Sequence, residues 1–334
     1  MEDDRYAADE IVAVIRDAVW KAPIPTSAYR RICQRIEPER EVVNAPRFDQ
    51  PLTDRWGILT TPLRLAGAPA MRPSAAGSFP ALNALAAAMP WGKSLIDDVA
   101  RQLRIQLALG RPWVRLEPML LVGDPGVGKT WLARRLAAAL QIEFASLELG
   151  NTSDDRLLSG TARGWTNTVP AWPLVMMAGS AIANPMLLLD ELDKAGGSDR
   201  HGHVHRALLS MLEPASAGSW YDQCLLAPCD LSQVSWIACA NNLDPISAAL
   251  RSRFRVVTMP QPEPEHFDAV LASVIAGMAA GWEVAPAMLP DLPGRARRLL
   301  RERFARDRSV RALARNAHAL IGAVLADSGG PRRQ

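Results

Sequence analysis

Hydrophobic residues are arranged differently on the two sides of residue 91. Before it, residues 11–19 have the spacing of an amphipathic helix, and residues 38–90 are rich in proline, glycine and alanine without a sustained period. After it, short apolar runs that end in glycine or aspartate alternate with helical patterns, which is typical of parallel βαβ units. Beyond the segment Pro260–Pro264 the pattern stays helical to about residue 327.

The alternating pattern predicts an α/β domain followed by a smaller all-helical domain. The expected strands are Pro118–Val122, Ile142–Glu148, Met186–Asp190, Val234–Ala240 and Phe254–Met259. The expected helices include Thr130–Leu140, Ala171–Ala183 and His203–Glu213. We therefore divide the chain into an accessory helix with a proline- and alanine-rich segment (residues 1–90), a parallel β-sheet with helices on both faces (91–260), a helical domain (261–327) and a tail (328–334).

The composition is that of a folded protein with no strong overall charge. The 334 residues are 49% hydrophobic, and 38 basic against 35 acidic residues leave a net charge of +3. This balance gives no reason to expect a nucleic acid or an anionic membrane as partner of the whole chain. The charge-free stretches 73–92 and 164–189 carry prolines, so neither is expected to span a membrane. The cysteines form no CxxC pair and no signal segment begins the chain, so we expect a reducing, cytoplasmic location.

Residues 123–130 carry the first chemical motif. They fit the P-loop pattern G-x-x-x-x-G-K-[ST] and lie between an expected strand and an expected helix. The glycines let backbone N–H groups surround phosphate oxygens, Lys129 reaches the β- and γ-phosphates, and Thr130 holds Mg²⁺. The alternative is a glycine-rich turn that binds nothing. The expected ATP-binding residues of this segment are Gly123, Asp124, Pro125, Gly126, Val127, Gly128, Lys129, Thr130 and Trp131.

A pair of carboxylates follows the apolar run 187–189. Asp190, at the strand end, is expected to bind Mg²⁺ together with Thr130 and so to belong to the nucleotide site. Glu191 is expected to polarise the water that attacks the γ-phosphate. The alternative is a solvated strand end, where acidic pairs are common. Together with the P-loop, the pair predicts a site that binds ATP and Mg²⁺ and hydrolyses the nucleotide.

The order of these motifs resembles that of AAA+ ATPases, in which a P-loop, an acidic pair, a strand-end asparagine, closely spaced arginines and a helical lid follow one another. Three segments are similar in sequence and spacing to the ATPase module of Lon-type proteases: Leu187–Lys194, Ala207–Pro214 and Trp236–Asp244. The resemblance runs from about Trp91 to the last expected helix. It implies a P-loop NTPase fold with a lid, and a chain that assembles with itself into a ring, commonly a hexamer.

The resemblance also implies roles for residues outside the two motifs. Asn241 takes the sensor-1 position, where an amide orients the attacking water, and Arg311 takes the sensor-2 position in the lid. Arg253, or else Arg251, takes the place of the arginine finger, which stabilises the transition-state charge at a neighbouring subunit's site. The alternatives are an asparagine that begins a turn and arginines that lie exposed in an arginine-rich chain.

The segment Gly160–Pro170 corresponds to the substrate-contact loop of Lon. Its aromatic–hydrophobic pair becomes Trp165 and Thr166 here, and a large aromatic side chain can grip a polypeptide without reading its sequence. The alternative is a tryptophan packed below the sheet edge. The resemblance also places the adenine near Met89–Lys93.

Two further expectations concern activity. No lysine follows Lys194, so the Ser–Lys dyad of Lon proteases has no counterpart after the lid of this chain. We therefore expect an ATPase without protease activity that unfolds proteins or remodels complexes. Two alternatives stay open: a nucleic-acid motor or loader that uses the arginines of residues 295–308, and a nucleotide-gated scaffold that hydrolyses little ATP.

Overall fold

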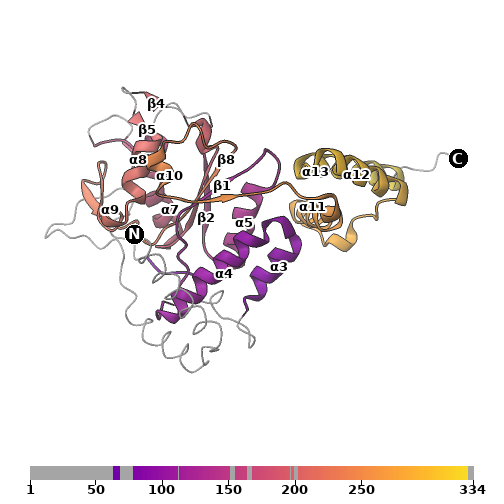
Figure 1. Ribbon diagram of the computed structural model, residues 1–334, viewed down its shortest axis with the longest axis horizontal. Coiled ribbons are helices and arrows are strands. Elements are labelled where there is room, and N and C mark those ends of the chain that lie inside the picture. Colours follow the sequence, from indigo (N-terminus) through magenta and orange to yellow (C-terminus); the bar gives the residue numbers. More distant parts are fainter. Residues whose placement is uncertain are drawn as a thin grey trace, which may run out of the picture.

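The computed structural model describes residues 63–67, 78–111, 113–150, 155–163, 168–195, 197–198 and 202–329. The expected N-terminal helix at residues 11–19 lies outside these ranges, and so does the substrate-contact pair Trp165 and Thr166. Within these ranges, no helix is both long enough and apolar enough to cross a bilayer. Figure 1 shows an α/β part that carries a group of C-terminal helices at one side.

A five-stranded parallel sheet forms the centre of the α/β part. Its strands run in the order β2 (Phe144–Glu148), β3 (Met186–Asp190), β8 (Ser235–Ala240), β1 (Met119–Val122) and β9 (Arg255–Thr258). Each strand lies where the sequence predicts one, and the largest difference is at β2, which begins at Phe144 rather than at Ile142. Strands β3, β8 and β1 lie inside the sheet, and their continuous apolar runs reflect burial on both faces.

Helices cover both faces of this sheet, as predicted. On β3, Leu188 belongs to one apolar cluster, which it shares with α4 and α5, whereas Leu187 and Leu189 belong to a second cluster with α7 and α8. Successive side chains of a strand point to opposite faces, so α4 and α5 lie on one face and α7 and α8 on the other. The bounds of these helices are α4 (Lys93–Ala108), α5 (Lys129–Leu140), α7 (Trp172–Ser180) and α8 (Val204–Leu212).

Shorter elements complete the α/β part. The strands β6 and β7 form an antiparallel hairpin before β8, and β4 pairs with β5 in the same way. The short elements are α6 (Arg156–Ser159), α9 (Pro214–Ala217), α10 (Ala248–Arg251), β4 (Gly197–Ser198), β5 (Gly202–His203), β6 (Trp220–Asp222) and β7 (Ala227–Cys229), with 3₁₀ turns at η1 (Pro90–Gly92), η2 (Leu192–Lys194), η3 (Pro264–His266) and η4 (Pro286–Met288).

One prediction about the N-terminal region is wrong. Residues 80–88, expected within a loosely structured segment, form helix α3 (Pro80–Ala88). Proline is tolerated in this first turn because the N–H that it lacks has no partner within a helix. Leu82 and Leu85 are buried, and α3 packs against α4 and α5. The helical period was hidden in the sequence because nearly every residue of α3 is small or apolar, so no polar face marks it.

Within the described residues, helices alone follow β9, which confirms the predicted helical region. These are α11 (Phe267–Gly281), α12 (Gly294–Asp307) and α13 (Val310–Gly329). They pack on one another, and the rings of Phe267 and Phe304 lie 6.0 Å apart between α11 and α12. Helix α11 also contacts α3, so the lid and the α/β part meet next to the P-loop helix α5 (Figure 1).

Candidate functional site

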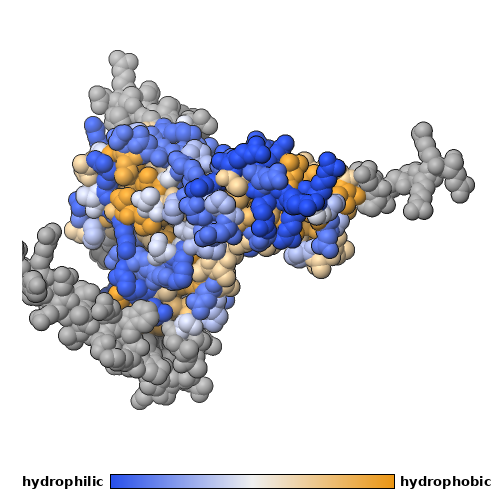
Figure 2. Space-filling model, turned by 45° about the vertical axis from the view of Figure 1, so that its right-hand side comes forward, coloured by the Kyte–Doolittle hydropathy of each residue, from blue (hydrophilic) through white to orange (hydrophobic). Residues whose placement is uncertain are grey.

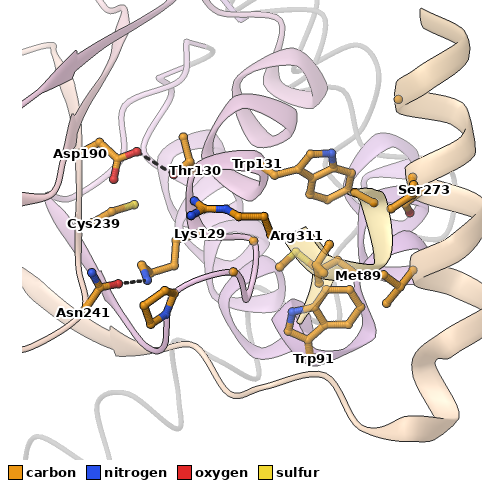
Figure 3. Close-up of a pocket in the computed structure, with 18 of the residues that line it drawn as sticks. Met89, Trp91, Lys129, Thr130, Trp131, Asp190, Cys239, Asn241, Ser273 and Arg311 are labelled. Atoms are coloured by element: carbon orange, nitrogen blue, oxygen red, sulfur yellow. Dashed lines mark hydrogen bonds between the residues drawn. The ribbon is translucent and has the colours of Figure 1, made fainter. Parts of the chain in front are cut away.

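A cavity of about 760 Å³ lies where the P-loop, the end of α3 and the lid meet. Its volume falls in the range that small-molecule sites occupy. Figure 3 shows Lys129 and Thr130 at one end of it, facing Asp190 from β3 and Asn241 from the end of β8. Arg311 enters the same cavity from α13. The fold therefore brings together the predicted phosphate, metal and sensor residues.

Two glycines in left-handed conformation shape the P-loop. The φ angle is 88° at Gly126 and 97° at Gly128, which a residue with a Cβ adopts at a cost of about 1–2 kcal/mol. Gly126 also lies against the lid, where a Cβ would come within 2.9 Å of the Ser309 hydroxyl. The loop leads directly into α5, whose first residue is Lys129. The free N–H groups of this helix start therefore suit an anion.

Lys129 is nearly enclosed by the site, with 9% of the residue exposed. Its Nζ donates to the carbonyl oxygens of Gly123 at 2.6 Å and Asp124 at 3.1 Å, and to Oδ1 of Asn241 at 2.8 Å. Burial lowers the pKa of Lys129 from its usual value, and nearby groups that include Asp190 oppose part of that shift. A negatively charged ligand would therefore find an ammonium group that has given up much of its hydration.

The two predicted metal ligands are in direct contact. Thr130 donates from its hydroxyl to Oδ2 of Asp190 at 2.7 Å, although the two residues are 60 positions apart. The other oxygen of Asp190 accepts the backbone N–H of Glu191 at 2.9 Å. Hydroxyl and carboxylate oxygens are ligands that suit Mg²⁺, which usually takes its remaining ligands from water and substrate phosphates. The residues present therefore fit a magnesium ion held between Thr130 and Asp190.

Glu191 lines the cavity in a constrained conformation. Its φ is 57°, in the left-handed region that residues with a Cβ seldom adopt. Its Oε1 accepts from Nζ of Lys194 at 2.5 Å, and this hydrogen bond raises the pKa of Lys194. Its Oε2 lies so close to Gly150 that a Cβ at that position would overlap it. The carboxylate is thus paired with Lys194 and lies against Gly150, just after β2.

Asp193 is a site residue that the sequence analysis missed. Its Oδ2 accepts the backbone N–H groups of Asn241 at 3.1 Å and of Asn242 at 3.2 Å. Because Asn241 contacts Lys129, Asp193 fixes the backbone that carries the predicted sensor amide. The signal available in the sequence was its place in the segment Asp190–Lys194, next to the acidic pair.

The predicted arginines fall in two different places. Arg311 lines the cavity, and the N–H of its neighbour Val310 donates to the carbonyl of Gly126 at 3.1 Å. Arg253 is not among the described residues that line the cavity; its guanidinium pairs with Glu213 at 2.5 Å, and 39% of its side chain is exposed. Arg251 is half-buried. The structure therefore brings Arg311 to the site, whereas the finger role of either other arginine stays a prediction.

The far end of the cavity is apolar and is shared by α3, η1 and the lid. Met89 is fully buried there, and Trp91 donates from Nε1 to the carbonyl of Val127 at 3.0 Å, so both lie beside the P-loop as expected for the adenine region. Sequence reasoning missed the contribution of α11, because residues that line a cavity from a distant helix carry no local motif. The α11 residues that line it are Val270, Ser273, Val274, Gly277 and Met278.

The central part of the chain matches a known family. Residues 119–261 match the family model described as "ATPase family associated with various cellular activities (AAA)". The peroxisomal Lon protease homolog 2 of Oryza sativa subsp. japonica is 33% identical over 214 residues, which are 64% of this chain and 24% of the relative. The Lon protease of Chloroherpeton thalassium is 39% identical over 137 residues, or 41% of this chain and 16% of the relative.

The aligned region spans a quarter or less of the length of these relatives. The family match at residues 119–261 includes the P-loop, the acidic pair and Asn241, whereas the apolar end of the cavity and Arg311 lie outside it. The match to the AAA family therefore covers residues 119–261, and the chain is similar to Lon proteases over part of its length.

Proposed function

We propose that this chain binds Mg²⁺–ATP in the cavity and hydrolyses it. The observation that carries the proposal is the meeting of two pairs at the start of α5: Lys129 with Asn241, and Thr130 with Asp190. Phosphoryl transfer needs positive charge at the phosphates, oxygen ligands for the metal ion and a group that orients the attacking water. These side chains, placed at a helix N-terminus, supply all three.

Each residue has a role in the proposed reaction. Lys129 exchanges its carbonyl partners for oxygens of the β- and γ-phosphates. Thr130 and Asp190 hold Mg²⁺, which neutralises phosphate charge when bound. Asn241 orients the water that attacks the γ-phosphorus in line with the leaving oxygen, and Arg311 contributes charge from the lid.

Glu191 has to change partners before it can polarise that water. Its carboxylate is paired with Lys194, and the side chains of the two residues are 30% and 51% exposed. Water screens such partly exposed ion pairs, so nucleotide binding can open this pair at little cost. Once free, Glu191 accepts a proton from the attacking water as general base.

We further propose that the chain acts as an oligomer on polypeptide substrates. The similarity to proteins named Lon proteases supports this, and the exposed guanidinium of Arg253 suits an arginine finger delivered to a neighbouring subunit. We propose that the chain does so without cleaving peptide bonds itself. A cytoplasmic location stays the expectation from the cysteine pattern.

The test is the ATPase rate per chain across chain concentration, first alone and then with an unfolded protein or with DNA. A rate that rises with concentration and with unfolded protein supports the oligomeric, polypeptide-acting ATPase. Stimulation by DNA, with a steep loss as salt is raised, would favour a nucleic-acid motor that uses the arginines of α12. Tight ATP binding with negligible hydrolysis under every condition would favour the nucleotide-gated scaffold.

A further inference from the structure

Trp131 lies at the edge of the buried face of helix α5. The buried face of this helix follows the spacing expected for packing on the sheet and consists of Leu132, Ala133, Leu136, Ala137 and Leu140. Trp131 lies beside that face and is half-buried, while Arg135, one turn later, is exposed. Trp131 thus packs against the edge of the core and leaves part of its side chain exposed.

The exposed part of Trp131 belongs to the wall of the cavity. Figure 3 shows its indole between the phosphate end, marked by Lys129 and Thr130, and helix α11, marked by Ser273. Met89 and Trp91 lie across the cavity from it. A nucleotide whose phosphates sit at the P-loop is expected to place its base toward this apolar end, because the polar side chains of Asp190 and Asn241 line the opposite end.

Other groups at this end are already committed to contacts within the chain. The Nε1 of Trp91 bonds to Val127, and its ring lies 5.8 Å from that of His266. The hydroxyl of Ser273 donates to the carbonyl of Ala88 at 3.1 Å. Trp91 and Ser273 thus serve to join the lid, η1 and α3, whereas Trp131 lines the cavity from α5.

The indole of Trp131 is also held in place from one side. The guanidinium carbon of Arg135 lies 5.4 Å from the centre of the Trp131 ring, a distance at which a cation interacts favourably with an aromatic face. A planar side chain that is fixed before binding loses little conformational freedom when a ligand stacks on it.

We propose that Trp131 stacks on the nucleobase of the bound nucleotide, with Arg135 as the residue that positions the indole. The proposal rests on ATP binding at the P-loop, as proposed above, and assigns recognition of the base to a residue separate from the phosphate-binding groups. Stacking uses the flat face that every nucleobase offers, so it adds affinity for the base without reading its hydrogen-bonding edge.

Two ligands separate this proposal from the phosphate site: Mg²⁺–ATP, and Mg²⁺–tripolyphosphate, which has no base. Calorimetric titration of the full chain should show Trp131→Ala binding ATP roughly 5- to 100-fold more weakly than wild type, with tripolyphosphate affinity changed less than about twofold. Trp131→Phe should recover most of the ATP affinity because it restores an aromatic face. Trp282→Ala is the control and should bind both ligands like wild type. Trp282 is a lid tryptophan that is 39% exposed and is not among the described residues that line the cavity.

Three outcomes would overturn the base contact. The first is an equal loss of affinity for ATP and for tripolyphosphate in Trp131→Ala, which would indicate a structural role. The second is an unchanged ATP affinity in that variant. The third is a wild-type chain that binds both ligands equally well. In the last two cases the phosphate site stands. By contrast, tripolyphosphate binding that survives in Lys129→Ala would overturn the proposed phosphate site itself.

Discussion

Asp193 gives the sharpest test of how the site positions its sensor amide. Its Oδ2 accepts two backbone N–H groups, one from half-buried Asn241 and one from exposed Asn242. A hydrogen bond to a charged group contributes about 1.5–3 kcal/mol, and water can replace the exposed one. Asp193→Ala therefore removes the free energy of about one such hydrogen bond from the segment that holds Asn241 against Lys129.

If that free energy is lost from the transition state, it corresponds to a fall in kcat of roughly 10- to 100-fold. We predict such a fall in kcat with less than about a threefold change in ATP affinity. The reason is that, within the described residues, Asp193 makes no hydrogen bond to the P-loop. Steady-state ATPase kinetics, ATP titration and thermal unfolding would be measured together. Asp244→Ala is the matched control, since Asp244 bonds to Asn242 on the exposed side of the same turn. A kcat within twofold of wild type in Asp193→Ala would refute the positioning argument.

Three further predictions concern assembly, lid stability and substrate contact. Mixing Arg253→Ala chains with Lys129→Ala chains should restore part of the ATPase activity that each lacks, because an intact site then meets an intact finger; no recovery would count against a finger acting between subunits. Asp268→Asn should destabilise the chain by about 1 kcal/mol or less at neutral pH, since Arg297 and then Arg301 lower the pKa of this exposed carboxyl. That stabilisation is present above the usual carboxyl pKa of about 4 and is lost as the pH falls through the lowered pKa of Asp268. Denaturant unfolding should therefore show the stability difference between the two proteins shrinking as the pH falls below about 4, and a difference that stays constant would contradict the assignment. Trp165→Ala should remove any stimulation of ATPase activity by unfolded protein, and stimulation that survives would indicate a structural tryptophan.

Local patterns were enough to predict the sheet. Strands β3 and β8 are buried on both faces, so each reads as an unbroken apolar run, and the P-loop lies between a strand and a helix as its chemistry requires. Helix α3 escaped prediction because a sequence of alanines and leucines between two prolines has no polar face to reveal its period.

Contacts between distant residues explain what the sequence could not supply. Asp193 acts on a backbone 48 positions away, and α11 reaches the cavity only because the lid folds back toward α3. Such pairings depend on tertiary packing rather than on spacing. Trp131 was predicted as part of the nucleotide site by its place after the P-loop, but its position off the buried face of α5 became apparent only with the helix in place.

In the proposed site, Lys129 is required for ATP binding and Glu191 for hydrolysis. The most direct measurement compares ATP binding with phosphate release in a single turnover for wild type, Lys129→Ala and Glu191→Gln. We predict that Glu191→Gln keeps ATP affinity within a few-fold of wild type while phosphate release falls by about 10²–10⁴-fold, and that Lys129→Ala loses binding by roughly 100-fold or more. Wild-type affinity in Lys129→Ala, or an unchanged rate of phosphate release in Glu191→Gln, would contradict the account.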